Sequence, residues 1–273
     1  MSNYNPDEYK AFQSFLEKAC GIVLGENKHY LVSSRLTRLM RDNNIESLQQ
    51  LVDVLQQSTS GKLRSLVVEA MTTNETLWFR DVYPFEVLTK VIYPEYKKEG
   101  KQALRIWSAA CSSGQEPYSI SMATEEYVSQ NPGLKIEVVA TDISQAILND
   151  AKEARYDALA LARGLSEERK RRFFSPIGNQ WQVNANIRSR VSFRESNLLQ
   201  LYTIMGKFDL IFCRNVLIYF SADSKKNILK RMAETLNPRG FLLLGASESI
   251  VQYSDAFEMV RASTGVVYRK KAF

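Results

Sequence analysis

The spacing of apolar residues changes near residue 100, and this change restricts the possible fold more than any other feature of the chain. Beyond it, short runs of consecutive apolar residues occur at 103–110, 136–141, 208–213 and 241–245. Stretches with helical character lie between these runs, starting near residue 117 and spanning about 144–155 and 223–236. Continuous apolar strands that alternate with helices are typical of a parallel sheet covered on both faces. The sequence therefore predicts an α/β, doubly wound domain over residues 85–273.

The first 70 residues show helical spacing and no strand pattern. One helix is indicated by apolar residues from Tyr9 to Cys20, and Gly21 can end it. Three more amphipathic stretches follow at 28–42, 45–57 and 62–71, with a break at 58–61. We expect an N-terminal helical domain over residues 1–70 and a linker over 71–84.

Three smaller features complete the predicted fold. Residues 173–193 contain turn pairs and short alternating segments, which indicate a small antiparallel β-subdomain inserted in the α/β domain. Residues 237–240 (NPRG) read as a turn, and residues 266–268 (VVY) as an edge strand at the carboxyl end.

Residue usage excludes several kinds of site. His29 is the only histidine, which removes most histidine triads and nearly all zinc sites, so we expect no metal. Three cysteines without metal-type spacing fit a reducing compartment. No apolar run reaches the ~18 residues of a membrane span, and the amino terminus does not resemble a signal peptide. We expect a cytoplasmic protein without membrane insertion, and the net charge of +6 suggests an acidic partner.

A ligand of such a sheet is expected at the carboxyl ends of its strands. The turn after the first strand (112–117, SSGQEP) lacks the G-x-G-x-x-G pattern of dinucleotide sites. Asp142 ends the second strand, where a carboxylate can bind ribose hydroxyls or cap the next helix, and position alone favours neither role. A nucleoside ligand without a phosphate-binding loop favours S-adenosylmethionine (SAM) over NAD.

Five blocks of sequence, in order, resemble one known family. The blocks are 72–80 (TTNETLWFR), 113–119 (SGQEPYS), 141–143 (TDI), 197–199 (NLL) and 212–220 (FCRNVLIYF). Together they look like the chemotaxis receptor glutamate methyltransferases, the CheR family, over nearly the whole chain. The resemblance implies a class I SAM-dependent methyltransferase with a Rossmann-like sheet. It also implies transfer of a methyl group to glutamate carboxylates of receptors, which yields methyl esters and S-adenosylhomocysteine (SAH).

The resemblance also implies roles for particular residues. Position by position, the cofactor would be bound by Asn74, Thr76, Arg80, Glu116, Asp142, Asn197, Leu198, Arg214 and Asn215. Within this set Asp142 would bind the ribose, and Asn197 with Leu198 would line the adenine side. Arg214 and Tyr219 would lie at the reacting centre, whereas Phe220 reads as core. A glutamate carboxylate, with a reference pKa of about 4.3, is already anionic at neutral pH, so its methylation needs no general base.

A basic helix suggests the partner. Arg35, Arg38 and Arg41 are spaced by three residues on one face, and Val32, Leu36, Leu39 and Met40 mark the opposite face. Such a face can dock the acidic cytoplasmic bundle of a chemotaxis receptor, although a solvated face without a partner has the same pattern. The resemblance places arginines of this helix against the receptor and implies a monomer recruited to membrane receptor arrays. Docking of a receptor's C-terminal tether peptide on the β-subdomain stays open, since residues 176–179 differ from the family's loop.

Two alternatives remain. A basic chain of this fold could be a nucleic-acid methyltransferase, but residues 213–216 (CRNV) replace the Asn/Asp-Pro-Pro-aromatic element of amino-directed base methyltransferases. A non-catalytic receptor adapter is the second alternative. The retained polar residues of the five blocks argue against it.

Overall fold

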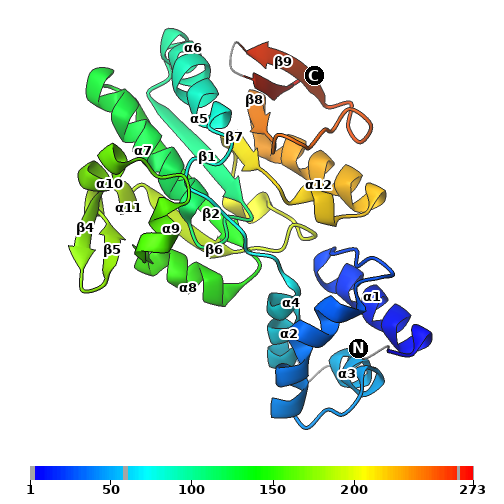
Figure 1. Cartoon of the computed structure of the whole chain (residues 1–273). Coiled ribbons are helices and arrows are strands. Elements are labelled where there is room, and N and C mark those ends of the chain that lie inside the picture. Colours follow the sequence, from blue (N-terminus) through cyan, green and yellow to red (C-terminus); the bar gives the residue numbers. More distant parts are fainter. Residues whose placement is uncertain (1–3, 58–60, 263–264, 273) are drawn as a thin grey trace.

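A twisted seven-stranded sheet organises the larger part of the molecule (Figure 1). The computed structural model describes residues 4–57, 61–262 and 265–272. The strand order is β6-β2-β1-β7-β8-β10-β9, in which the first five strands are parallel and β10 runs antiparallel to both neighbours. The strands are β1 Ala103–Ala109, β2 Lys135–Asp142, β6 Val191–Glu195, β7 Phe208–Cys213, β8 Leu236–Leu243, β9 Phe257–Ala262 and β10 Gly265–Lys270.

Helices cover both faces of this sheet, as the continuous apolar strands predict. Successive residues of β1 show why: Ile106 packs in one buried cluster and Trp107 in the other, on the opposite face. The helical elements are α5 Tyr83–Val87, η1 Leu88–Ile92, α6 Tyr93–Lys98, α7 Gln115–Gln130, α8 Gln145–Glu153, α9 Ala158–Ala162, α10 Glu167–Phe173, α11 Ala185–Arg188, η2 Thr203–Met205, η3 Leu217–Tyr219 and α12 Ala222–Thr235. The α/β fold class is confirmed.

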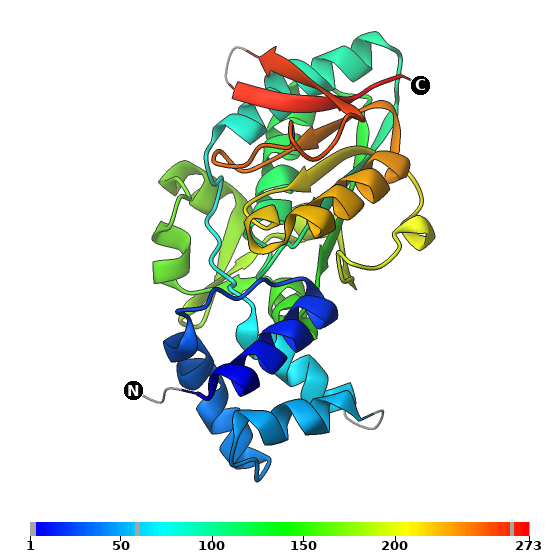
Figure 2. The same ribbon diagram turned by 90° about the vertical axis from the view of Figure 1, so that its right-hand side faces the viewer.

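Four helices form a bundle with its own core at the carboxyl edge of the sheet (Figures 1 and 2). They are α1 Pro6–Cys20, α2 His29–Asp42, α3 Leu48–Gln56 and α4 Gly61–Met71. The predicted stop at Gly21 is confirmed, because this residue caps α1 with a left-handed φ of 81°. The expected break at 58–61 lies largely outside the described residues.

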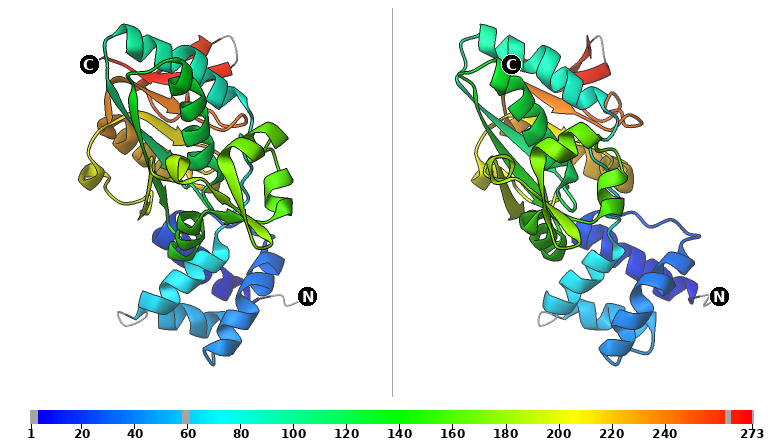
Figure 3. Two further views of the ribbon diagram at one scale, coloured as in Figure 1. Left: turned by 90° about the vertical axis from the view of Figure 1, so that its left-hand side faces the viewer. Right: turned by 60° about the vertical axis from the view of Figure 1, so that its left-hand side comes forward.

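The small antiparallel sheet is present, but with other bounds than predicted. It consists of β3 Arg155–Tyr156, β4 Phe174–Ile177 and β5 Gln180–Val183, in the order β3-β5-β4, and its hairpin projects from the body (Figure 3). Residues 191–193, which we had assigned to it, belong to β6 at the edge of the large sheet. Their side chains are only half-buried. Apolar and polar residues therefore alternate along this strand as they would in a small sheet at the surface.

Two predictions near the carboxyl end were wrong. Residues 237–240 lie within β8 and not in a turn between elements. They form an irregularity there: Leu236 pairs with Phe208, and pairing resumes with Phe241 opposite Leu210. The strand containing residues 266–268, β10, lies between β8 and β9, so β9 is the edge strand.

The close packing of Gly21 against Phe220 leads to a prediction about the interface between the bundle and the sheet domain. A Cβ at Gly21 would lie 2.3 Å from the Phe220 ring, whereas a Cβ at Gly100, with a similar φ of 77°, meets no described atom within 4 Å. Gly100→Ala should cost about 1–2 kcal/mol for the left-handed backbone alone. Gly21→Ala should cost about 1–3 kcal/mol more because of overpacking. Urea unfolding of both variants checks this, and equal losses would contradict it.

Candidate functional site

A cavity of about 320 Å³ lies between the helical bundle and the carboxyl ends of β1, β2 and β7. This volume falls at the lower end of the roughly 300–1,000 Å³ typical of small-molecule sites. The structure brings the predicted cofactor residues together here, together with Tyr219. The cavity is lined by Asn74, Thr76, Arg80, Glu116, Asp142, Asn197, Leu198, Arg214, Asn215 and Tyr219. Residues 22–25 and 71–73 line it from the bundle side.

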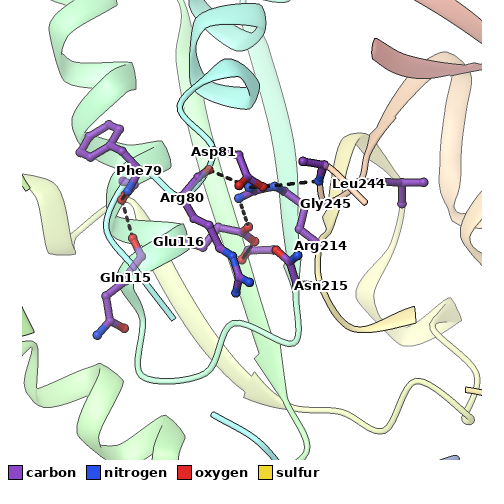
Figure 4. A network of polar contacts seen from close by, with 12 residues as sticks. Phe79, Arg80, Asp81, Gln115, Glu116, Arg214, Asn215, Leu244 and Gly245 are labelled. Atoms are coloured by element: carbon purple, nitrogen blue, oxygen red, sulfur yellow. Dashed lines mark hydrogen bonds and ion pairs between the residues drawn. The ribbon is translucent and has the colours of Figure 1, made fainter. Parts of the chain in front are cut away.

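Residues 74–80, within the predicted 71–84 linker, are bonded to the sheet domain. The Ser112 hydroxyl donates to the Asn74 carbonyl at 3.0 Å, and the Phe79 amide donates to Ser119 Oγ at 3.0 Å. Trp78 and Phe79 are buried in the core beneath the sheet. Arg80 follows, and its guanidinium makes one long hydrogen bond, to the Glu75 carbonyl at 3.3 Å. In Figure 4 the Arg80 side chain extends past Glu116, away from Asp81.

Asp142 lies at the end of β2, buried at the cavity wall. Its Oδ2 accepts a hydrogen bond from the Ser112 amide at 2.8 Å, and its Oδ1 accepts one from the Ser144 amide at 3.1 Å. Burial raises the pKa of this carboxyl, and the backbone hydrogen bonds oppose the rise. Ser144, not Asp142, is the N-cap of α8. The capping alternative is therefore wrong, and lone pairs of the carboxylate remain for a ligand.

Arg214 lies at the centre of a buried ion-pair cluster (Figure 4). Its guanidinium donates to Glu116 Oε2 at 3.0 Å, to Asp81 Oδ2 at 2.7 Å and to the Arg80 carbonyl at 2.6 Å. Glu116 also accepts from the Ser108 hydroxyl at 2.7 Å. Only 1% of the Arg214 side chain is exposed. Its two terminal nitrogens are thus bonded inside the protein, whereas its buried Nε has no partner among the described residues, and this geometry favours a role in holding the cavity wall.

Asp81 and Glu248 are site residues that sequence reasoning missed. Glu248 Oε2 accepts from the Asn215 amide at 2.6 Å and from the Gly245 amide at 2.9 Å. These bonds hold Asn215 with a left-handed φ of 57°, and its Oδ1 is buried without a partner among the described residues. An acidic residue just after a strand at the ligand-binding edge could have signalled Glu248. No local pattern in the sequence indicates that Asp81 pairs with Arg214.

Two other predicted residues join the bundle to the sheet. Asn197 Nδ2 donates to the Ala19 carbonyl at 2.8 Å, so this amide already binds α1. The Tyr219 carbonyl accepts from the Val23 amide at 2.8 Å. Leu198 packs in a buried cluster, as does Phe220, whose assignment to the core is confirmed.

The basic helix α2 differs from the prediction. Arg38 and Arg41 are exposed, and their guanidinium groups lie 3.6 and 3.7 Å from Asp42. Arg35 is half-buried and donates to the carbonyls of Met71 and Thr72 at the end of α4, so the prediction that it is exposed like Arg38 and Arg41 was wrong. Helical spacing shows which residues share a face and not what packs beside them. Leu39, expected to be buried, is half-buried.

The cavity offers the complementary groups that SAM requires. SAM carries a ribose, an amino-acid carboxylate and a sulfonium cation. Asp142 can accept from ribose hydroxyls, Arg80 has a guanidinium without a carboxylate partner among the described residues, and Asn215 has a buried free carbonyl oxygen. Within the described ranges no cluster of potential metal ligands occurs, and no helix there is long and apolar enough to span a membrane.

Comparisons with known proteins identify the family of this chain. The family model "CheR methyltransferase, SAM binding domain" matches residues 74–266, and "CheR methyltransferase, all-alpha domain" matches residues 7–72. The chemotaxis protein methyltransferase Cher2 of Pseudomonas putida is 56% identical over 99% of this chain and 100% of its own length. Chemotaxis protein methyltransferase 1 of Pseudomonas aeruginosa is equally similar, with the same coverage. The chemotaxis protein methyltransferase of Borreliella burgdorferi is 32% identical over 91% of this chain and 90% of its own. The chain therefore belongs to the CheR family of SAM-dependent chemotaxis methyltransferases.

Proposed function

We propose that this chain methylates glutamate side chains on the cytoplasmic domains of chemotaxis receptors. The products would be glutamate γ-methyl esters and SAH. Family membership supports a protein substrate in chemotaxis, and the structure supports the chemistry. The enzyme would act in the cytoplasm as a monomer that is recruited to receptor arrays.

The observation that carries the proposal is the state of the cavity's own ionisable groups. Burial raises the pKa of the Cys111 thiol well above its ordinary value, so it is neutral at pH 7. Glu116 is paired with Arg214, and Asp142 accepts two backbone hydrogen bonds. Glu75, the third carboxylate of the described lining, is paired with Arg163 at 2.9 Å, so each lining carboxylate already has a partner and none stands out as a base for an alcohol or amine nucleophile. A carboxylate needs none, because it is already ionised.

The protein's own residues would bind and orient the reactants. Asp142 would bind the ribose, and Arg80 the carboxylate of the methionyl part, which suits a guanidinium. The remaining contacts would come from Asn74, Thr76, Glu116, Asn197, Leu198 and Asn215. Bound SAM supplies an electrophilic methyl group on a sulfonium. Two opposite charges then cancel as the bond forms, so exclusion of water by the bundle should favour transfer.

Arg214 and Tyr219 would act differently at the reacting end. Arg214 would act through Glu116 and Asp81, by fixing the wall on which the cofactor rests. The Tyr219 side chain lines the cavity, and its backbone is bound to Val23 of the bundle. We assign Tyr219 to the approach of the substrate carboxylate.

Receptor docking would use the exposed part of the basic helix, Arg38 and Arg41. Asp42 neutralises these arginines only in part, because the pairs are long and exposed. The projecting β4–β5 hairpin is a candidate site for a receptor's C-terminal tether peptide. A nucleic-acid substrate has no supporting observation in the cavity.

The reaction itself is tested by incubating the enzyme with SAM labelled in its methyl group and a receptor cytoplasmic fragment. Label should enter the fragment and leave as methanol on mild alkaline treatment, because a carboxylate ester hydrolyses whereas an N-methyl group does not. A fragment with glutamine at the methylated positions is the control. Label that resists alkali would exclude the ester.

Removal of Asp142 tests the ribose assignment. Asp142→Ala should weaken SAM binding at least about tenfold, because charge-assisted hydrogen bonds contribute roughly 1.5–3 kcal/mol each. Glu137→Ala is a matched control: it removes an exposed carboxylate from the opposite end of the same strand. Calorimetry on receptor-free protein measures both, and equal affinities in the two variants would refute the assignment.

The raised pKa of Asp142 gives a pH dependence. Only the ionised carboxylate accepts hydrogen bonds from both ribose hydroxyls, so SAM affinity should be full above this pKa and decline as pH falls through it. Because burial raises the pKa, the decline should start at a higher pH than for an ordinary aspartate. Dissociation constants across acidic pH, where Asp142→Ala should show a weaker dependence, provide the measurement. If both proteins show the same pH dependence, a group other than Asp142 is responsible for it.

Charge reversal on α2 tests receptor docking. Arg38→Glu with Arg41→Glu should raise the KM for receptor and reduce the salt dependence of methylation, since like charges then face an acidic bundle. Stability should change within about ±0.5 kcal/mol, and SAM affinity should hold. The matched control is Lys97→Glu with Lys98→Glu, which changes two exposed lysines of α6 at the other end of the molecule (Figure 1). If both double variants methylate receptor alike at low salt, α2 does not meet the receptor.

A further inference from the structure

Arg35 belongs to α2, but its guanidinium contacts the chain that leaves α4. Nη1 donates to the carbonyls of Met71 and Thr72, each at 2.8 Å, and Nη2 donates to Thr73 Oγ1 at 3.2 Å. The last carbonyls of a helix have no partner within that helix. A cation there also interacts favourably with the helix dipole. Arg35 therefore caps α4 from a neighbouring helix.

The capped residues lead directly into the cavity. Residues 71–73 line it themselves, and Asn74 and Thr76 follow. The next fixed point is the Asn74 carbonyl, which accepts from Ser112 in the β1–α7 loop. The segment is thus held by the bundle at residues 71–73 and by the sheet domain at residue 74.

The contacts of Arg35 differ in kind from those of its neighbours on α2. Arg38 and Arg41 reach only Asp42 among the described residues, at 3.6 and 3.7 Å, and are exposed. Arg35 is half-buried, and its planar fork places Nη1 on two carbonyls and Nη2 on the Thr73 hydroxyl, which a lysine ammonium reproduces poorly. The regular spacing of the three arginines therefore conceals two separate tasks.

We propose that Arg35 is a positioning residue of the SAM site. By holding residues 71–73 against α2, it sets where Asn74 and Thr76 enter the cavity. It contacts neither cofactor nor substrate. The inference rests on the proposed assignment of this cavity to the cofactor, and it separates the basic helix into one cofactor-positioning arginine and two receptor-docking arginines.

The test compares Arg35→Met with Arg38→Met in the full chain. Methionine keeps much of the apolar stem and removes the donors. Arg35→Met should weaken SAM binding, measured by calorimetry without receptor, by about tenfold, as expected for lost hydrogen bonds from a charged donor. Its KM for SAM should rise, whereas its KM for a receptor fragment should stay the same. Arg35→Lys should recover part of the affinity, and Arg38→Met should retain all of it.

Two results would overturn the proposal. An unchanged SAM affinity with a raised KM for receptor would make Arg35 a docking residue. An unchanged SAM affinity with only a lower melting temperature would make it a structural residue of the bundle. If Arg35→Met does not fold, Arg35→Lys against wild type decides by the same criteria. The Asp142→Ala variant distinguishes failure of the Arg35 proposal from failure of the cavity assignment. If Asp142→Ala also binds SAM normally, SAM does not bind in this cavity as proposed.

Discussion

The buried guanidinium of Arg214 is the interaction on which the site depends. It joins three segments that are distant in the chain: the end of β7, the first turn of α7 through Glu116, and the turn before α5 through Asp81. Removal of one partner from a buried ion pair typically costs about 3–5 kcal/mol, because the other charge is left unpaired. The cluster therefore fixes the cavity wall. It also holds the Arg80 backbone, so that the Arg80 side chain is directed to the cavity and not to the core.

The second constraint is the close fit between bundle and sheet. Gly21 lies against the Phe220 ring, the Val23 amide binds the Tyr219 carbonyl, and the Ser144 hydroxyl donates to Glu69 at 2.6 Å. These contacts place the bundle over the carboxyl ends of the strands, where an open α/β sheet binds its ligands. The bundle thus forms one wall of the cavity proposed for the cofactor and also carries the arginines proposed for the receptor. One small domain can in this way link cofactor binding with substrate recognition.

The sequence predicted those parts of the structure that depend on local pattern. Continuous apolar runs located β1 and β7 within one residue, and helical spacing with Gly21 located the end of α1. Sequence patterns gave wrong predictions where the structure depends on packing between segments. The half-buried edge strand β6 alternates like a surface hairpin, and β8 contains an irregularity that reads as a turn. Five sequence blocks identified residues that meet in one cavity. They could not show that Arg214 is paired with Asp81, or that Arg35 faces inward to α4, because both pairings join distant segments.

SAM bound in this cavity would lie between the bundle and the sheet and contact both. Hydrogen–deuterium exchange of backbone amides, with and without SAH, tests it most directly, because protection reports on each wall separately. We expect SAH to slow exchange in residues 22–25 and 71–73 on the bundle side and, at the same ligand concentration, in the 110–114 and 142–144 segments on the sheet side. Protection confined to the sheet side would contradict it, and would leave the bundle with receptor binding alone.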